Sequence, residues 1–226
     1  MRWVPDRTGR FAQRPHYEAE ELDGECEGLI YDHLRKRNGK VAFPIDTEDI
    51  VALLESRVAE FEPYADLSGE GVDVEGATAF FRGSLPFVKI SATLYAPNLV
   101  NRLRTTLTHE LGHVHFHTCL YGLDVMGDLF ETAGPSFDAV CYRGSILGAA
   151  KSDWMEWQAG YACGSFLMPA ADVKDLVRGA LGSGARSRPP ADSEVGTELI
   201  ANTMHRYAVS QDAARVRLLV LGHLTA

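Results

Sequence analysis

The chain has 226 residues, of which 46% are hydrophobic, and its formal net charge is −9. This length and composition allow one sizeable globular domain, or a domain with a small appendage. The negative charge opposes binding to nucleic acid and to anionic membrane surfaces, so any contact with DNA would need a local basic patch.

The first 16 residues, MRWVPDRTGRFAQRPH, predict an extended arm that lies on the surface of the domain. They lack the apolar core of a signal peptide, and the sequence has no apolar run that could span a bilayer. We therefore expect a cytoplasmic protein. The cysteines are far apart and form no C-x-x-C pair, which argues against a disulfide framework and against a structural zinc knuckle. They are Cys26, Cys119, Cys141 and Cys163.

Apolar residues at helical spacing predict a helix over 18–37, which Gly39 ends. The segment VAFP (41–44) predicts a short strand, and a second amphipathic helix follows with Asp46 or Thr47 as its cap. The runs VEGATAFF (74–81) and FVKISATL (87–94) predict two strands, because RGSLP between them suits a hairpin or a tight connection.

A long helix is predicted to begin at Asn98. Its leucines recur every four residues and form one apolar stripe that faces the core: Leu99, Leu103, Leu107 and Leu111. His109 and His113 lie roughly 200° around the axis from this stripe, so they face away from that core.

The second half of the chain is predicted to be mainly helical. Residues 118–152 are rich in glycine and show no sustained period, so we expect a loop there. Helices are expected over 153–168, which Pro169 stops, and over 170–181. A linker over 182–193 leads to two helical patterns around YAVS, with Ser210 as the cap of the second.

The segment THELGHVHFH (108–117) contains the pattern H-E-x-x-H. On a helix, His109 and His113 are one turn apart and can bind one ion at about 2.0–2.1 Å. Glu110 lies beside them as the general base, and bound zinc lowers the pKa of a water molecule to about 7. Gly112 allows close approach by a neighbouring element. We therefore expect one zinc ion per chain, with Glu110 as the catalytic residue.

The third metal ligand is not determined by this segment alone. A thiolate at Cys119 is chemically possible. His117 would be a third ligand on one straight helix, and three such ligands spread too far along the axis to close on one ion. We expect His115 and His117 to pack or to line the site instead. An acid on a second helix is the remaining alternative, and Glu156 in DWMEWQAGYACGSFLMP fits.

Several segments together resemble the ImmA/IrrE family of metallopeptidases. They are NRLRTTLTHELGHVHFH (101–117), EWQAGYACGSFLMP (156–169), VAFPIDTEDIVALLE (41–55) and the tail YAVSQDAARVRLLVLGHL (207–224). The resemblance covers most of residues 17–224, but not the arm or residues 118–152. The family often has Asn or Asp four residues after the ligand glutamate, where this chain has Gly160.

The resemblance implies an α+β fold in which residues 17–182 form a zincin-like domain with a small, mostly antiparallel sheet packed on helices. Residues 191–226 would form a short, helix-turn-helix-like helical segment. Glu156 would be the third metal ligand. The task implied is cleavage of a helix-turn-helix transcriptional repressor, which would derepress genes of a mobile element or of a stress response.

We therefore expect a cytoplasmic, zinc-dependent endopeptidase that acts on a specific protein and not at a membrane. Tyr161, Tyr142 and His117 are alternatives for stabilising the transition state or supporting the ligands. The strand VEGATAFF is expected to be exposed and to pair with the substrate backbone.

Two other classes of function stay open. The protein could bind and sequester its partner without cleaving it, or it could be a DNA-binding regulator with a vestigial peptidase domain. Residues 192–223 contain three arginines against four acidic residues, so no basic stripe is present. Direct binding of nucleic acid is therefore not expected.

Overall fold

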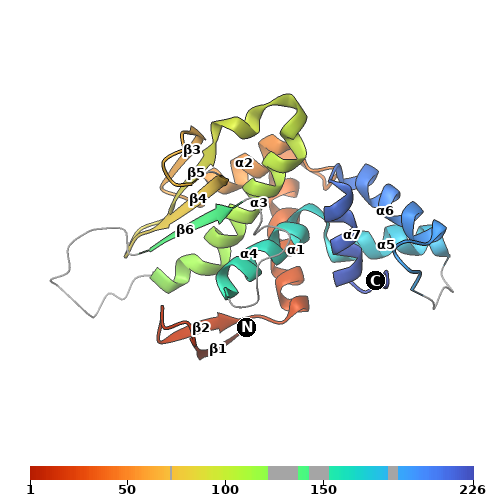
Figure 1. The fold of residues 1–226 in the computed structure, drawn as a ribbon, viewed down its shortest axis with the longest axis horizontal. Coiled ribbons are helices and arrows are strands. Elements are labelled where there is room, and N and C mark those ends of the chain that lie inside the picture. The colour runs from red at the N-terminus through yellow and green to blue at the C-terminus, as the bar shows by residue number, and fades with distance from the viewer. Residues whose placement is uncertain (72, 122–136, 143–152, 183–187) are drawn as a thin grey trace. The chain divides into compact units, whose positions relative to one another are not determined.

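A computed structural model describes residues 1–71, 73–121, 137–142, 153–182 and 188–226 (Figure 1). The chain forms an α+β fold with two compact units. The first unit contains residues 1–22 and 47–163, and the second contains residues 23–46 and 164–226. None of the helices in the described part of the chain combines the length and the apolar character needed to cross a membrane.

The N-terminal arm is a β-hairpin. Strand β1 (Arg2–Pro5) pairs antiparallel with β2 (Gln13–His16), with Arg2 opposite His16. The tip of the hairpin is attached to the first unit by Phe11, whose ring packs edge-on against the rings of Tyr121 and Trp154 at centroid distances of 5.4 and 6.3 Å. The arm is therefore a packed element of this unit.

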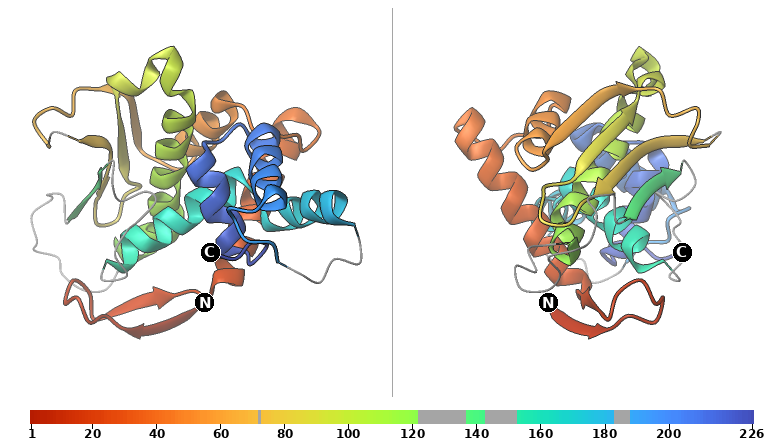
Figure 2. Two further views of the ribbon diagram at one scale, coloured as in Figure 1. Left: turned by 45° about the vertical axis from the view of Figure 1, so that its right-hand side comes forward. Right: turned by 90° about the vertical axis from the view of Figure 1, so that its left-hand side faces the viewer.

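The main sheet has four strands in the order β3-β5-β4-β6. They are β3 (Glu60–Ala65), β4 (Val74–Phe80), β5 (Phe87–Ser91) and β6 (Phe137–Tyr142). The β3–β5 pair is parallel, and the β5–β4 and β4–β6 pairs are antiparallel. The sheet is thus small and mostly antiparallel, and the long helix α3 contacts β4, β5 and β6 (Figure 2).

The expectation that VEGATAFF is an exposed strand is wrong. Strand β4 is paired on both sides, with β5 and with β6, and six of its seven residues are buried. A half-exposed strand shows alternating apolar and polar residues, and this run does not. The absence of alternation is typical of a strand covered on both faces. The outer strands of the described sheet are β3 and β6.

Two further expectations about strands are wrong, and one strand lies where none was predicted. Residues 41–44 form no strand; their exposure alternates, but Phe43 packs instead against Tyr31 and Tyr207 of the second unit, at ring-centroid distances of 6.3 and 5.3 Å. No element was predicted for residues 60–65, which form strand β3; its Pro63 is tolerated because the strand lies at an edge of the sheet. Strand β6 lies within residues 118–152, for which a loop was predicted.

Helix α3 (Val100–His117) is the central element of the first unit. It follows two short 3₁₀ helices, Ala92–Tyr95 and Pro97–Leu99, and a third, Thr118–Tyr121, comes after it. Leu103, Leu107 and Leu111 are buried, as the stripe predicted, and α3 contacts α2 (Thr47–Glu55) as well as the sheet. The opposite face of α3 is buried too, because α4 (Trp154–Leu167) packs close to it at Gly112.

The second unit is helical. It contains most of α1 (Ala19–Asn38), together with α5 (Ala170–Leu181), α6 (Glu194–Tyr207) and α7 (Gln211–Val220). The predicted cap of α7 is confirmed, because the Ser210 hydroxyl accepts a hydrogen bond from the Ala213 backbone N–H at 3.2 Å. The turn between α6 and α7 is short, and Ala208 there adopts a left-handed conformation with φ 48°.

A buried ion pair crosses this second unit. Arg217 of α7 donates to the Asp23 carboxylate at 2.6 Å and to the Met168 carbonyl oxygen at 3.0 Å, and its side chain is 3% exposed. Ser165 donates to the same carboxylate oxygen at 2.7 Å. The arginine therefore satisfies a carboxylate that lies largely out of water.

Replacing Arg217 by Met should lower the free energy of unfolding by about 3–5 kcal/mol, because it leaves the Asp23 carboxylate buried without its cation. Denaturant-induced unfolding measures the change. Arg215→Met is the matched control: Arg215 is exposed on the same helix, and its replacement should change stability by no more than about 0.5 kcal/mol. Equal effects of the two substitutions would contradict this account of the ion pair.

Candidate metal centre

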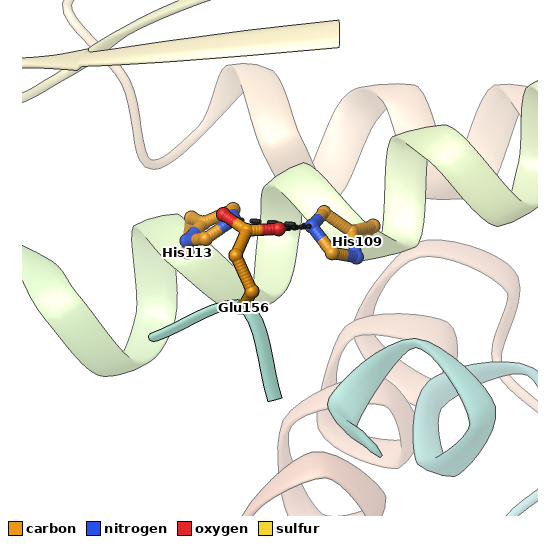
Figure 3. A group of neighbouring side chains, drawn as sticks. All are labelled: His109, His113 and Glu156. Atoms are coloured by element: carbon orange, nitrogen blue, oxygen red, sulfur yellow. Dashed lines mark hydrogen bonds and ion pairs between the residues drawn. The ribbon is translucent and has the colours of Figure 1, made fainter. Parts of the chain in front are cut away.

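Two helices bring three potential metal ligands together. His109 and His113 lie one turn apart on α3, and Glu156 lies in the first turn of α4 (Figure 3). The two Nε2 atoms are 3.1 Å apart, and the Glu156 carboxylate oxygens lie 3.3 Å from Nε2 of His109 and 3.2 Å from Nε2 of His113. Within the described residues, this group could hold a metal ion.

The spacing of these donor atoms fits a small tetrahedral ion. Ligand atoms at about 2.0–2.1 Å from such an ion lie about 3.3–3.4 Å from one another. The two Nε2 atoms are 3.1 Å apart, and each lies 3.2–3.3 Å from one oxygen of Glu156, Oε2 for His109 and Oε1 for His113, so these contacts are close to that value. Two imidazoles and one carboxylate are a donor set typical of zinc sites that keep a fourth position open.

The close approach of the two helices depends on Gly112. A Cβ atom at this position would lie 3.0 Å from Cα and 3.1 Å from the carbonyl oxygen of Ala159 on α4. Ala159 and Ala162 have small side chains and are completely buried. Small residues on both helices therefore allow the backbone contact that brings Glu156 within reach of the histidines.

The start of α4 is fixed by Asp153. Its carboxylate accepts hydrogen bonds from the backbone N–H groups of Met155 and Glu156 at 3.1 and 3.4 Å, as an N-cap does. Arg10 of the N-terminal hairpin binds the same carboxylate at 2.7 Å. The position of Glu156 in the first turn is thus supported by the cap and by the hairpin.

The carboxylate and the two imidazoles of this group shift one another's pKa values. Burial alone would raise the pKa of Glu156, but the hydrogen bonds with His109 and His113 hold it far below its usual value. Burial lowers the pKa of His109. For His113, burial acts in the same direction, but the hydrogen bond and charge of Glu156 outweigh it and raise the pKa. The ionised carboxylate therefore favours a positive charge at this place, whether a proton or a metal ion carries it.

Glu110 faces the sheet. Its carboxylate is completely buried and accepts a hydrogen bond from the Thr78 hydroxyl of β4 at 2.5 Å. Gly76, two residues earlier on β4, has no room for a side chain, because an added Cβ would lie 3.0 Å from Cδ of Glu110 and would overlap a carboxylate oxygen. One helix thus presents its two candidate metal ligands toward α4 and its acid toward β4.

His117 lies next to His113, on the side away from Glu156. Its Nδ1 is 3.0 Å from Nδ1 of His113, the ring nitrogen that faces away from Glu156, and its Nε2 is 3.1 Å from Oε1 of Gln158. Burial, followed by the charge of His113, lowers the pKa of His117 well below its ordinary value. This placement agrees with a supporting role and not with ligation.

The other residues considered from the sequence lie elsewhere. Cys119 is exposed, and its thiol lies 3.6 Å from the Phe116 carbonyl oxygen. His115 is partly buried with its ring against Phe116. Tyr161 packs near Trp157, at a centroid distance of 5.8 Å and about 140° around the α4 axis from Glu156. Tyr142 belongs to β6, but its side chain lies outside the described residues.

Sequence reasoning missed two parts of this centre, Gln158 and the Gly76–Thr78 segment. A glutamine in an apolar helix and a glycine in a strand are weak signals by themselves. Gly76 does mark a close approach, that of the Glu110 side chain, as glycines inside strands often do.

Comparison with protein-family models gives no match, and comparison with curated proteins gives none either. The assignment of this centre therefore depends on its own geometry. The resemblance to the ImmA/IrrE family stays a prediction.

Gly112→Ala should push α3 and α4 apart, because the new methyl group meets backbone atoms of Ala159 that cannot move independently. We expect a loss of about 1–3 kcal/mol in the free energy of unfolding and weaker zinc binding. Unfolding by denaturant and a zinc titration measure the two effects. Gly28→Ala on α1 is the control, because a Cβ there meets nothing within 4 Å. This substitution should raise the free energy of unfolding by up to about 1 kcal/mol.

Glu156→Ala should weaken zinc binding, because it removes one of the three converging donors. Competition with a chromophoric chelator measures the affinity. Glu194→Ala is the control: Glu194 is an exposed acid in the first turn of another helix, and its loss should leave zinc binding unchanged. Unchanged affinity in Glu156→Ala would contradict the ligand assignment and would point back to Cys119 or His117.

Proposed function

We propose that the protein is a zinc-dependent endopeptidase that cleaves a specific protein partner. The observation that carries this proposal is the arrangement on α3, where two buried imidazoles converge with Glu156 while the intervening Glu110 is held separately against β4. A metal-storage or purely structural site needs no such separate acid.

His109, His113 and Glu156 would hold the ion. Zinc supplies Lewis acidity, because it lowers the pKa of a water molecule to about 7 and polarises a carbonyl oxygen. Glu110 takes the proton as the water oxygen bonds to the substrate carbonyl carbon. It then gives a proton to the amide nitrogen as the C–N bond breaks. The Thr78 hydroxyl orients the carboxylate for both transfers by donating to Oε2.

The substrate would be bound as an extended segment. Strand β6 is the last strand beside β4 in the described sheet, and α3 contacts it. Addition of a substrate strand at this side of the sheet is the mode that supports recognition through backbone hydrogen bonds. The resemblance to ImmA/IrrE peptidases favours a helix-turn-helix repressor as the partner, with derepression of its genes as the result.

Glu110→Gln should abolish cleavage and keep about one zinc per chain, because the amide fills the same space but cannot accept the proton. The assay labels new protein N-termini after zinc-loaded protein is added to a lysate of the source cells. Wild-type protein should generate a defined set of termini that is missing with Glu110→Gln. The same termini with both proteins would contradict the role of Glu110, and an absence of termini with wild-type protein would contradict the peptidase proposal.

The sequestration alternative predicts a different result in the same experiment. The wild-type protein would then co-purify with an intact partner and generate no new termini.

Direct DNA binding is disfavoured by the second unit itself. Two of the three arginines in residues 192–223 are engaged within the protein: Arg206 donates to Asp172 at 2.6 Å, and Arg217 is buried against Asp23. Neutralised arginines contribute little to phosphate binding, which depends on counterion release by available cations.

A further inference from the structure

A chain of buried contacts leads from His113 to the N-terminal hairpin. Nδ1 of His113 lies 3.0 Å from Nδ1 of His117, and Nε2 of His117 lies 3.1 Å from Oε1 of Gln158. Nε2 of Gln158 lies 3.1 Å from the carbonyl oxygen of Pro15 on β2. His113, His117 and Gln158 are at most 1% exposed, so water does not compete for these contacts.

The last contact fixes the direction of all the others. A backbone carbonyl only accepts hydrogen bonds, so the amide nitrogen of Gln158 donates to Pro15 and the amide oxygen faces His117. Because that oxygen also only accepts, Nε2 of His117 carries the hydrogen. A histidine that binds a metal through Nε2 carries its hydrogen on Nδ1, so Nδ1–H of His113 donates to Nδ1 of His117. Nε2 of His113 is left with its lone pair toward the metal group.

We infer that His117, Gln158 and the Pro15 carbonyl are a positioning relay that fixes the tautomer and the ring orientation of His113 for metal binding. The N-terminal hairpin is therefore part of the metal centre. This inference rests on the metal site of the proposed function, but it concerns residues that do not touch the ion.

The relay supplies what a metal-bound histidine generally needs. Such a histidine almost always donates its second N–H to an oxygen or a comparable acceptor, and loss of that acceptor typically costs about 10–100-fold in metal affinity. Gly160, one turn after Glu156 on α4, has no side chain for this task. Nδ1 of His109 is buried and has no hydrogen-bond partner among the described residues. Of the two histidines, His113 is thus the one with a defined partner.

The hairpin is held firmly enough to act as the anchor. Arg10 binds Asp153, and Phe11 packs against Trp154, whose ring also lies edge-on to His117 at a centroid distance of 5.5 Å. Tyr17, just after β2, packs against Phe116 at 5.0 Å. These contacts fix the backbone on both sides of Pro15, so its carbonyl is a stationary acceptor.

Zinc affinity in the full-length protein tests the relay. His117→Phe removes the acceptor of His113 while keeping a ring, and Gln158→Met removes the amide while keeping the length of the side chain. Each should bind one zinc per chain with about 10–100-fold lower affinity. His115→Phe is the matched control, because the ring of His115 packs against Phe116 on the same helix and no hydrogen bond of the relay passes through it; the zinc affinity of this variant should equal that of the wild type.

The outcomes separate failure of the relay from failure of the proposed function. If wild-type protein binds one zinc tightly and both variants bind equally tightly, the relay is overturned and the metal site stands. If His117→Phe abolishes zinc binding as completely as His113→Phe does, His117 is a ligand and the relay is overturned. If wild-type protein binds no zinc, the proposed function fails, and the relay is then decided by the spectra below.

Long-range ¹H–¹⁵N spectra of the wild-type protein test the hydrogen-bond directions without any variant that could misfold. His117 should show its hydrogen on Nε2 in both the metal-free and the zinc-loaded protein. In the zinc-loaded protein His113 should show its hydrogen on Nδ1. A hydrogen on Nδ1 of His117 would reverse the order of donors and overturn the relay.

Discussion

The close contact between α3 and α4 at Gly112 is the constraint on which the metal centre depends. Because Gly112 has no side chain and Ala159 has a small one, the helix backbones approach closely, and Glu156 comes within 3.3 Å of both ligand histidines. The same approach removes the polar face of α3 from water. Three groups with lone pairs then converge in a largely buried place, where a positive charge, carried by a proton or by a metal ion, stabilises the carboxylate.

Helix α3 packs against two neighbours, α4 on one face and β4 on another. Successive helical residues point about 100° apart, so His109 and Glu110 face different neighbours. The histidine faces α4, and the glutamate faces β4, where Gly76 provides space and Thr78 provides a donor. The sheet therefore orients the acid, and α4 completes the ligand group. The hairpin adds a third support through Gln158 and His117, at the ring nitrogen of His113 that a bound ion would not use.

Local patterns in the sequence predicted most of the helices. The leucine stripe predicted α3, Pro169 predicted the end of α4, and Ser210 predicted the cap of α7, because these signals depend on neighbours in the sequence. The i, i+4 spacing placed His109 and His113 on one face for the same reason.

The features that the sequence did not predict depend on partners far away in the chain. Strand β4 was expected to be exposed but is paired on both sides, because β6 pairs with it from a segment that carries no periodic signal. The hairpin in the arm depends on pairing between β1 and β2, which are separated in the sequence. Gln158 gains its role only when Pro15, 143 residues earlier, supplies a carbonyl group.

The most direct test of the central claim is a crystal structure of the zinc-loaded protein with anomalous diffraction measured at the zinc edge. The account predicts one anomalous peak per chain, within about 2.2 Å of Nε2 of His109, Nε2 of His113 and a carboxylate oxygen of Glu156. A peak bound by the Cys119 sulfur or by a ring nitrogen of His117, or no peak at this place, would contradict it.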